Sequence, residues 1–92
     1  MDNGPPNKTL VQIKGTVKGK KVDLSTYEVA ETDIESLKRA VMKVSGIDPN
    51  TFVLKARHSN GQLKKVNAVD VVGSLPQTVG NLIELEVVAN GK

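Results

Sequence analysis

The chain has 92 residues, and its 13 lysines and arginines against 10 aspartates and glutamates give a formal net charge of +3 at pH 7. It contains no cysteine, one tyrosine and one phenylalanine. We therefore expect one small domain with an aliphatic core, without a disulfide framework or a thiolate metal site. No apolar run has the roughly 20 residues that a membrane-spanning helix needs, and so few aromatic side chains argue against a base-stacking surface for nucleic acid.

The first segments of the chain predict a tail followed by a hairpin. Residues 1–8 are polar and include two adjacent prolines, which predicts a flexible N-terminal tail. Residues 9–89 should form the single domain, and residues 90–92 a frayed C-terminus. The domain should begin with a hairpin, because the alternating segments 9–16 and 21–26 flank a glycine-containing turn.

One amphipathic helix is predicted after a connection over residues 27–31. Thr32 and Glu35 have the spacing of a capping box, in which a hydroxyl and a carboxylate each accept from a backbone amide at the helix start. Gly46 suits the left-handed residue that ends many helices. Apolar residues recur between them at helical spacing and form a stripe that must pack on a sheet: Ile34, Leu37, Val41 and Val44.

Three further strands are predicted after the helix, over residues 51–57, 62–66 and 81–88. The intervening residues 67–80 are irregular. Alternation in the first and last strands directs these side chains inward: Phe52, Leu54, Ile83, Leu85 and Val87. The irregular region should be pinned to the core by its apolar residues: Val69, Val71, Val72 and Leu75. The predicted fold class is α+β, with a mixed sheet of four to five strands packed on one helix in the order ββαββ.

Three short motifs resemble the ubiquitin family. Residues 33–38, Asp-Ile-Glu-Ser-Leu-Lys, resemble the Thr-Ile-Glu-Asn-Val-Lys start of that family's helix. Residues 46–49, Gly-Ile-Asp-Pro, resemble its Gly-Ile-Pro-Pro helix exit, and residues 17–20, Val-Lys-Gly-Lys, resemble its Leu-Thr-Gly-Lys hairpin turn. The resemblance covers residues 10–88 and implies the ubiquitin-like β-grasp fold.

The resemblance also implies a module for protein–protein interaction. Family members that are conjugated to other proteins end in Gly-Gly, and this sequence contains no such pair. We therefore expect a non-conjugated ubiquitin-like module, without enzymatic activity or cofactor, which forms the N-terminal domain of a larger protein and is monomeric in isolation. The single histidine, His58, lies beside a turn with no second catalytic residue in view. The lack of cysteine fits a reducing compartment, so we expect an intracellular protein, cytoplasmic or nuclear.

Charged residues replace most of the apolar patch that the family presents on its sheet. The positions that match this patch are Val17, Lys55 and Glu86. Burying the two charged side chains against an apolar receptor helix would leave them desolvated. The candidate partner-binding face comprises Val17, Val53, Lys55, Arg57, Lys64, Lys65 and Glu86.

Two interpretations of this face remain open. Its basic residues form either a solvated charged surface or a docking face for an acidic partner. The partner is then an unidentified protein, such as a ubiquitin-pathway component. Alternatively, the chain is an assembly or scaffold domain that binds an acidic partner, or another copy, through the basic face, with Lys14 available on the first strand. Beside the apolar stripe, Lys38 is expected to pair with Asp23 or Asp70.

Overall fold

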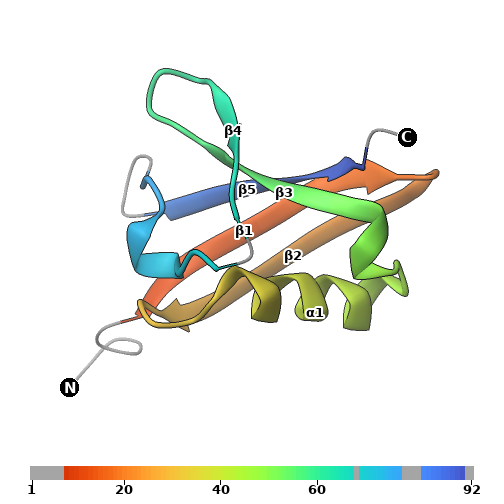
Figure 1. Cartoon of the computed structure of the whole chain (residues 1–92), viewed down its shortest axis with the longest axis horizontal. Helices are drawn as coiled ribbons and strands as arrows, with labels where there is room; N and C mark the ends of the chain where they lie inside the picture. Colours follow the sequence, from red (N-terminus) through yellow and green to blue (C-terminus); the bar gives the residue numbers. More distant parts are fainter. Residues whose placement is uncertain (1–7, 68, 78–81, 91–92) are drawn as a thin grey trace.

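The structure, a computed structural model of the chain, describes residues 8–67, 69–77 and 82–90. It has one helix and one five-stranded mixed sheet, in which the strand order is β2-β1-β5-β3-β4. Strands β1 and β5 are parallel and the other neighbours are antiparallel, and α1 lies against one face of the sheet (Figure 1). The elements are β1 Lys8–Val17, β2 Lys20–Val29, α1 Ile34–Ser45, η1 Pro49–Thr51, β3 Phe52–Arg57, β4 Leu63–Lys65, η2 Val72–Ser74 and β5 Leu82–Ala89.

The α+β class with one mixed sheet is confirmed, as are the three strands predicted after the helix, so the abbreviated order ββαββ lacks one strand. Three strands follow α1, because the short segment Leu63–Lys65 pairs with β3 and forms a strand of its own. Residue 8, expected in the tail, begins β1. Residues 1–7, 91 and 92, where the tail and most of the frayed end were expected, lie outside the described residues.

The N-terminal hairpin is longer than predicted. Its two-residue turn uses left-handed backbone at Lys18 (φ 52°) and Gly19 (φ 80°), which suits the twist of antiparallel strands. The strands stay paired from Val17↔Lys20 to Lys8↔Val29, so residues 27–29 continue β2 where a connection was expected. The pairing over ten residues makes β2 one of the two longest strands.

The predicted end of α1 is confirmed and its predicted start is wrong. Gly46 is left-handed (φ 75°), and its amide donates to the Met42 carbonyl at 2.7 Å. At the start, Asp33 is the N-cap, because its carboxylate accepts from the amide of Ser36 at 3.0 Å. The Thr32 hydroxyl instead donates to the Glu28 carboxylate at 3.2 Å.

The core lies between α1 and the sheet and is aliphatic apart from one ring. Val44 was predicted to belong to it, but 60% of its surface is exposed. It lies about 60° around the helix from Val41, at the edge of the face that meets the sheet. The fully buried side chains are Val11, Ile13, Val17, Val22, Ile34, Leu37, Val41, Phe52, Leu54, Val72, Ile83 and Val87.

The irregular segment after β4 is anchored at the start of α1. Val72 is fully buried, and its amide donates to the Thr32 carbonyl at 2.8 Å. The amide of Ile34 donates to the Asp70 carbonyl at 3.0 Å. Val69 was expected to help, but it is 86% exposed. Among the described residues, neither α1 nor the short 3₁₀ turns have the length and apolar character needed to cross a membrane.

Candidate protein-binding face of the sheet

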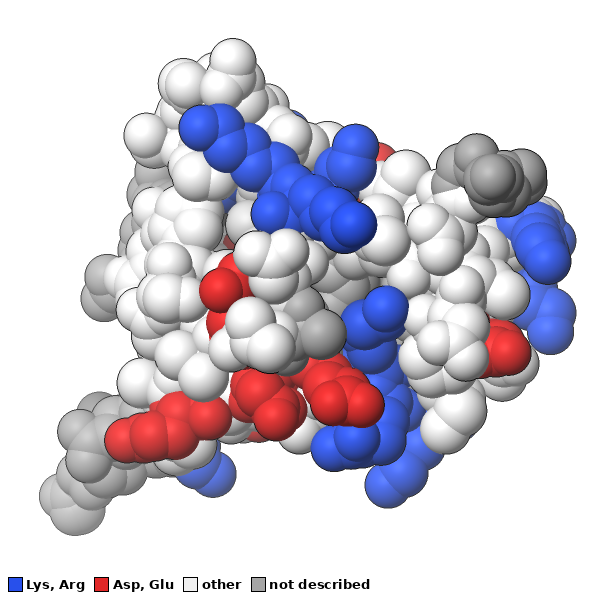
Figure 2. Space-filling model, in the orientation of Figure 1, with Lys and Arg blue, Asp and Glu red and all other residues white. Residues whose placement is uncertain are grey.

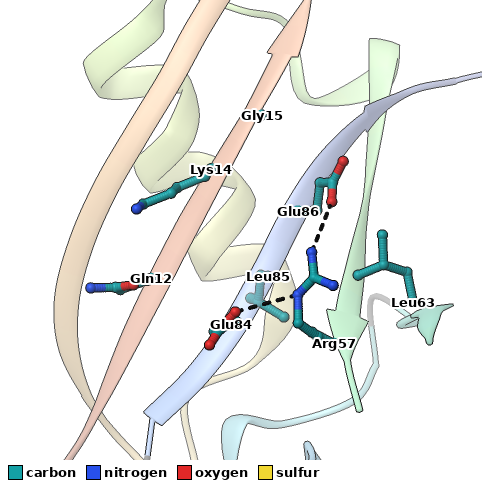
Figure 3. A pocket seen from close by; sticks show the side chains of 8 residues that line it. All are labelled: Gln12, Lys14, Gly15, Arg57, Leu63, Glu84, Leu85 and Glu86. Atoms are coloured by element: carbon teal, nitrogen blue, oxygen red, sulfur yellow. Dashed lines mark ion pairs between the residues drawn. The ribbon is translucent and has the colours of Figure 1, made fainter. Parts of the chain in front are cut away.

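The face of the sheet opposite α1 is uncovered in the described part of the chain, and we call it the outer face. Period-two alternation produces it. In β5 the core-facing residues Ile83, Leu85 and Val87 are buried, and the residues between them, Glu84 and Glu86, are only partly buried. Figure 3 views this face with α1 behind the sheet. Unlike the core face, the outer face carries mostly charged and polar side chains.

One row of charged side chains crosses all five strands of the outer face. Its register pairs run from Asp23 on β2 to Lys14 on β1, then to Glu86 on β5, Lys55 on β3 and Lys65 on β4. Charges alternate in sign along the first four positions, and the last two are both positive. The row therefore ends in a basic margin at β3 and β4.

Arg57 connects the two glutamates of β5. Its guanidinium lies 3.3 Å from a Glu84 carboxylate oxygen and 3.6 Å from a Glu86 oxygen, as the dashed lines in Figure 3 show. The third contact of the guanidinium is with the Gly61 carbonyl, to which it donates at 3.5 Å. These side chains are about 40% exposed, so each ion pair contributes no more than about 1 kcal/mol to stability. The main consequence is positional, because Arg57 lies between both carboxylates and offsets one of their two negative charges.

Lys55 and Lys65 differ from Arg57, because neither forms an ion pair with any residue that the structure describes. They are direct register partners, and like charges in such positions repel each other. Glu86, the other neighbour of Lys55, is already engaged by Arg57. Figure 2 shows that basic side chains gather over the part of the molecule where β4 lies in Figure 1. A carboxylate from another molecule would relieve this repulsion.

A shallow hollow of about 480 Å³ lies on the outer face above β5. Its lining holds two cationic and two anionic side chains but no hydroxyl, thiol or imidazole. The side chains of Gln12 and Lys14 point away from β5 in Figure 3, which leaves the hollow open. No group of histidine, aspartate and glutamate side chains suited to a metal ion occurs in the described ranges. The lining residues are Gln12, Lys14, Gly15, Arg57, Leu63, Glu84, Leu85 and Glu86.

Two residues of the predicted face are not on it. Val17 is fully buried, because β1 continues up to the turn and its alternation directs Val17 into the core, on the same side as Val11 and Ile13. It cannot contact a partner, and the proposed match to an exposed leucine of the ubiquitin family is wrong. Lys64 pairs with the buried Ala56, so it lies on the opposite side of the sheet from its exposed neighbour Lys65.

The other predicted residues lie together on the outer face, namely Val53, Lys55, Arg57, Lys65 and Glu86. The expected proximity of Lys55 and Glu86 is confirmed as a register pair, although the ion pair of Glu86 is with Arg57. Glu84 was missed. The alternation of residues 81–88 could have placed it outward, but only the register of β3 against β5 brings it to Arg57.

Comparison of the sequence with protein-family models and with curated proteins gives no match.

Proposed function

We propose that this chain is a β-grasp domain of the ubiquitin-like kind. Its support is the strand order β2-β1-β5-β3-β4, with parallel central strands and one helix across one face. The motif at the end of α1 adds to this, since Gly46 and the segment after it adopt a helix exit of the expected kind. The mismatch at Val17 limits the likeness to the fold and leaves the family's apolar patch without one of its three positions.

The function we propose is noncovalent binding of a partner protein through the outer face. The observation that supports it is the pair Lys55 and Lys65, held side by side without a carboxylate between them. Lys14, which is exposed, adds a third ammonium across β5. An acidic segment of the partner, laid along the row of charges, would place its carboxylates between these lysines. Such an interface gains specificity and association rate from charge complementarity more than from buried area.

An apolar helix of the type that binds ubiquitin fits this face poorly. It would cover Lys55 and Glu86, and it has no groups to replace the water around them. Burying Glu86 would also strip water from Arg57, which holds it. We therefore place the acidic partner first, and a ubiquitin-receptor helix becomes one outcome of the test.

The test is chemical-shift mapping of the folded chain with two probes, an acidic peptide and a ubiquitin-interacting helix. We expect the acidic peptide to shift the amides around Lys55 and Lys65 in a saturable way, and to bind less tightly as salt is raised. Lys65→Gln should weaken this binding. Lys64→Gln is the matched control, because the neighbouring residue has the same charge but lies on the other face.

Two results would contradict the proposal. In the first, Lys64→Gln and Lys65→Gln weaken peptide binding equally, which would mean that general positive charge and not the outer face attracts the peptide. In the second, the ubiquitin-interacting helix perturbs Lys55 and Glu86 saturably and without dependence on salt, which would identify an ordinary ubiquitin-type surface.

A further inference from the structure

The two edge strands of the sheet, β4 and β2, differ in length and in how well they are protected against pairing with another chain. At one edge, β4 has three residues, two of them lysine, and short charged strands of this kind resist pairing with other chains. At the other edge, β2 has ten residues, Lys20–Val29, without glycine or proline. Within the described part of the chain, β2 pairs only with β1. A long unprotected edge strand offers backbone donors and acceptors to another strand.

The hairpin turn determines which backbone groups β2 offers. In a two-residue hairpin, the residues that flank the turn bond to each other, so Lys20 directs its amide and carbonyl toward Val17. Alternate residues then direct theirs away from β1. Before Val29, whose carbonyl already accepts from the Thr32 amide, the outward set of β2 is therefore Lys21, Asp23, Ser25 and Tyr27. All four side chains are exposed, so a second strand could reach this backbone.

Charges along β2 select the direction and identity of that strand. The strand begins with Lys20 and Lys21 and approaches its end with Glu28. A parallel copy of β2 in register would place like charges opposite each other, whereas an antiparallel copy places each basic end against an acidic end. We propose that the β2 edge pairs antiparallel with β2 of a second copy of this chain, on a two-fold axis at Leu24. This inference is independent of the outer-face function.

The register with Leu24 on the axis satisfies three requirements at once. Lys21 then faces Tyr27 of the second copy, and Asp23 faces Ser25. Both are hydrogen-bonded pairs, so the outward backbone groups of both strands are used. The register keeps core-facing and outer-facing side chains on matching sides, which a shift by one residue would reverse. It also brings the two partly buried Leu24 side chains together.

The same register pairs Lys20 with Glu28 of the second copy, once at each end of the interface. The Glu28 carboxylate is already oriented, because it accepts from the hydroxyls of Thr26 at 2.7 Å and Thr32 at 3.2 Å. Lys20 is exposed and forms no ion pair among the described residues. The paired sheets would be continuous across the axis, with ten strands and one extended outer face.

Sedimentation velocity over a concentration series tests the pairing. We expect a reversible dimer with a Kd below about 1 mM. Ser25→Pro removes an amide that points away from β1, which an edge strand tolerates, and should raise the Kd at least about tenfold. Ser25→Ala keeps the amide and should dimerise like the original chain. Melts followed by circular dichroism confirm that each variant is folded.

Charge exchange tests the register. Lys20→Glu and Glu28→Lys should each be monomeric, because like charges then face each other across the axis. A mixture of the two variants should form a heterodimer, because each altered residue meets its complement. If Glu28→Lys loses stability with its two hydroxyl contacts, Ser25→Pro and Lys20→Glu still decide the proposal.

A chain that stays monomeric at about 1 mM overturns the proposal and leaves the edge to a strand of another protein. So does a dimer that Ser25→Pro leaves intact, because that dimer would use another surface. A dimer that is weakened by Ser25→Pro but strengthened by Lys20→Glu would mean that β2 is used in a different direction, and it overturns the antiparallel register.

Discussion

The ammonium of Lys38 lies over the ring of Phe52, 5.3 Å from its centroid. An acidic partner was expected, and that expectation is wrong for two reasons. Asp23 is on the outer face, on the opposite side of the sheet from α1. The Asp70 carboxylate accepts from the amide of Asn67 at 3.0 Å, and among the described residues it forms no ion pair with Lys38. A cation–π contact therefore joins α1 to the start of β3.

We predict that Lys38→Met lowers the free energy of unfolding by about 0.5–2 kcal/mol, because it keeps the aliphatic stem but removes the cation. Urea unfolding would measure this. Asp23→Asn is the control and should change stability by less than about 0.5 kcal/mol. A double-mutant cycle with Phe52→Leu isolates the contact, and a coupling energy of zero would show that Lys38 acts only through its stem.

The packing of α1 on the sheet gives a second prediction. Leu37 and Leu54 are 1% exposed on facing elements, so replacing either by alanine should cost about 2–5 kcal/mol through lost burial and the cavity left behind. Val44→Ala should cost less than about 0.5 kcal/mol, since that side chain is at the solvent edge. Thermal melts of the three variants would measure this, and equal losses in all three would place the core elsewhere.

Features encoded by neighbouring residues were predictable from the sequence. The alternation of Ile83, Leu85 and Val87 identified β5 and its buried face correctly. The left-handed Gly46 identified the end of α1. Both are local, since one depends on a period of two and the other on the backbone freedom of one residue.

Features that depend on distant partners were not predictable. Thr32 and Asp33 are both good N-cap residues, and Asp33, which also bridges to the distant Val71, is the one that caps α1. Lys64 and Lys65 are adjacent and alike, and only the pairing of β4 with β3 decides which lies on the outer face. The sequence could therefore list the basic residues of the candidate site but not their arrangement.

A third prediction concerns pH and the start of α1. The pKa of Asp33 is lowered from its ordinary value of 3.8, first by the hydrogen bond from the Ser36 hydroxyl, then by the one from the Ser36 amide. A lowered pKa in the folded state means that the carboxylate stabilises the fold above the ordinary pKa and that this contribution is lost as pH falls through the folded-state value.

We predict that Asp33→Asn removes this part of the pH dependence, because asparagine also caps helices but does not titrate in this range. The difference between the melting temperatures of the original chain and the variant should be constant from neutral pH down to about 4 and should shrink as pH falls further, toward the lowered pKa of Asp33. If the melting temperatures of the two proteins differ by the same amount at every pH from 7 to about 3, the Asp33 charge does not stabilise α1.

The contact between β1 and β5 gives the last prediction. Gly15 has φ of 154°, a backbone conformation that other residues rarely adopt. A Cβ atom at this position would overlap the backbone oxygen of Val87 and stand 2.9 Å from its nitrogen. Since β1 and β5 are the central parallel pair, they would have to separate at the point where Gly15 and Val87 are register partners.

Gly15→Ala should therefore cost about 3 kcal/mol or more, from the overlap and the strained backbone together. Gly19→Ala is the matched control, because Gly19 also has positive φ but nothing lies within 4 Å of its Cβ position. It should cost only about 1–2 kcal/mol, the price of left-handed backbone alone. Urea unfolding of both variants separates the two contributions. Equal losses would mean that backbone conformation accounts for the whole effect and that β1 and β5 have room for a methyl group between them.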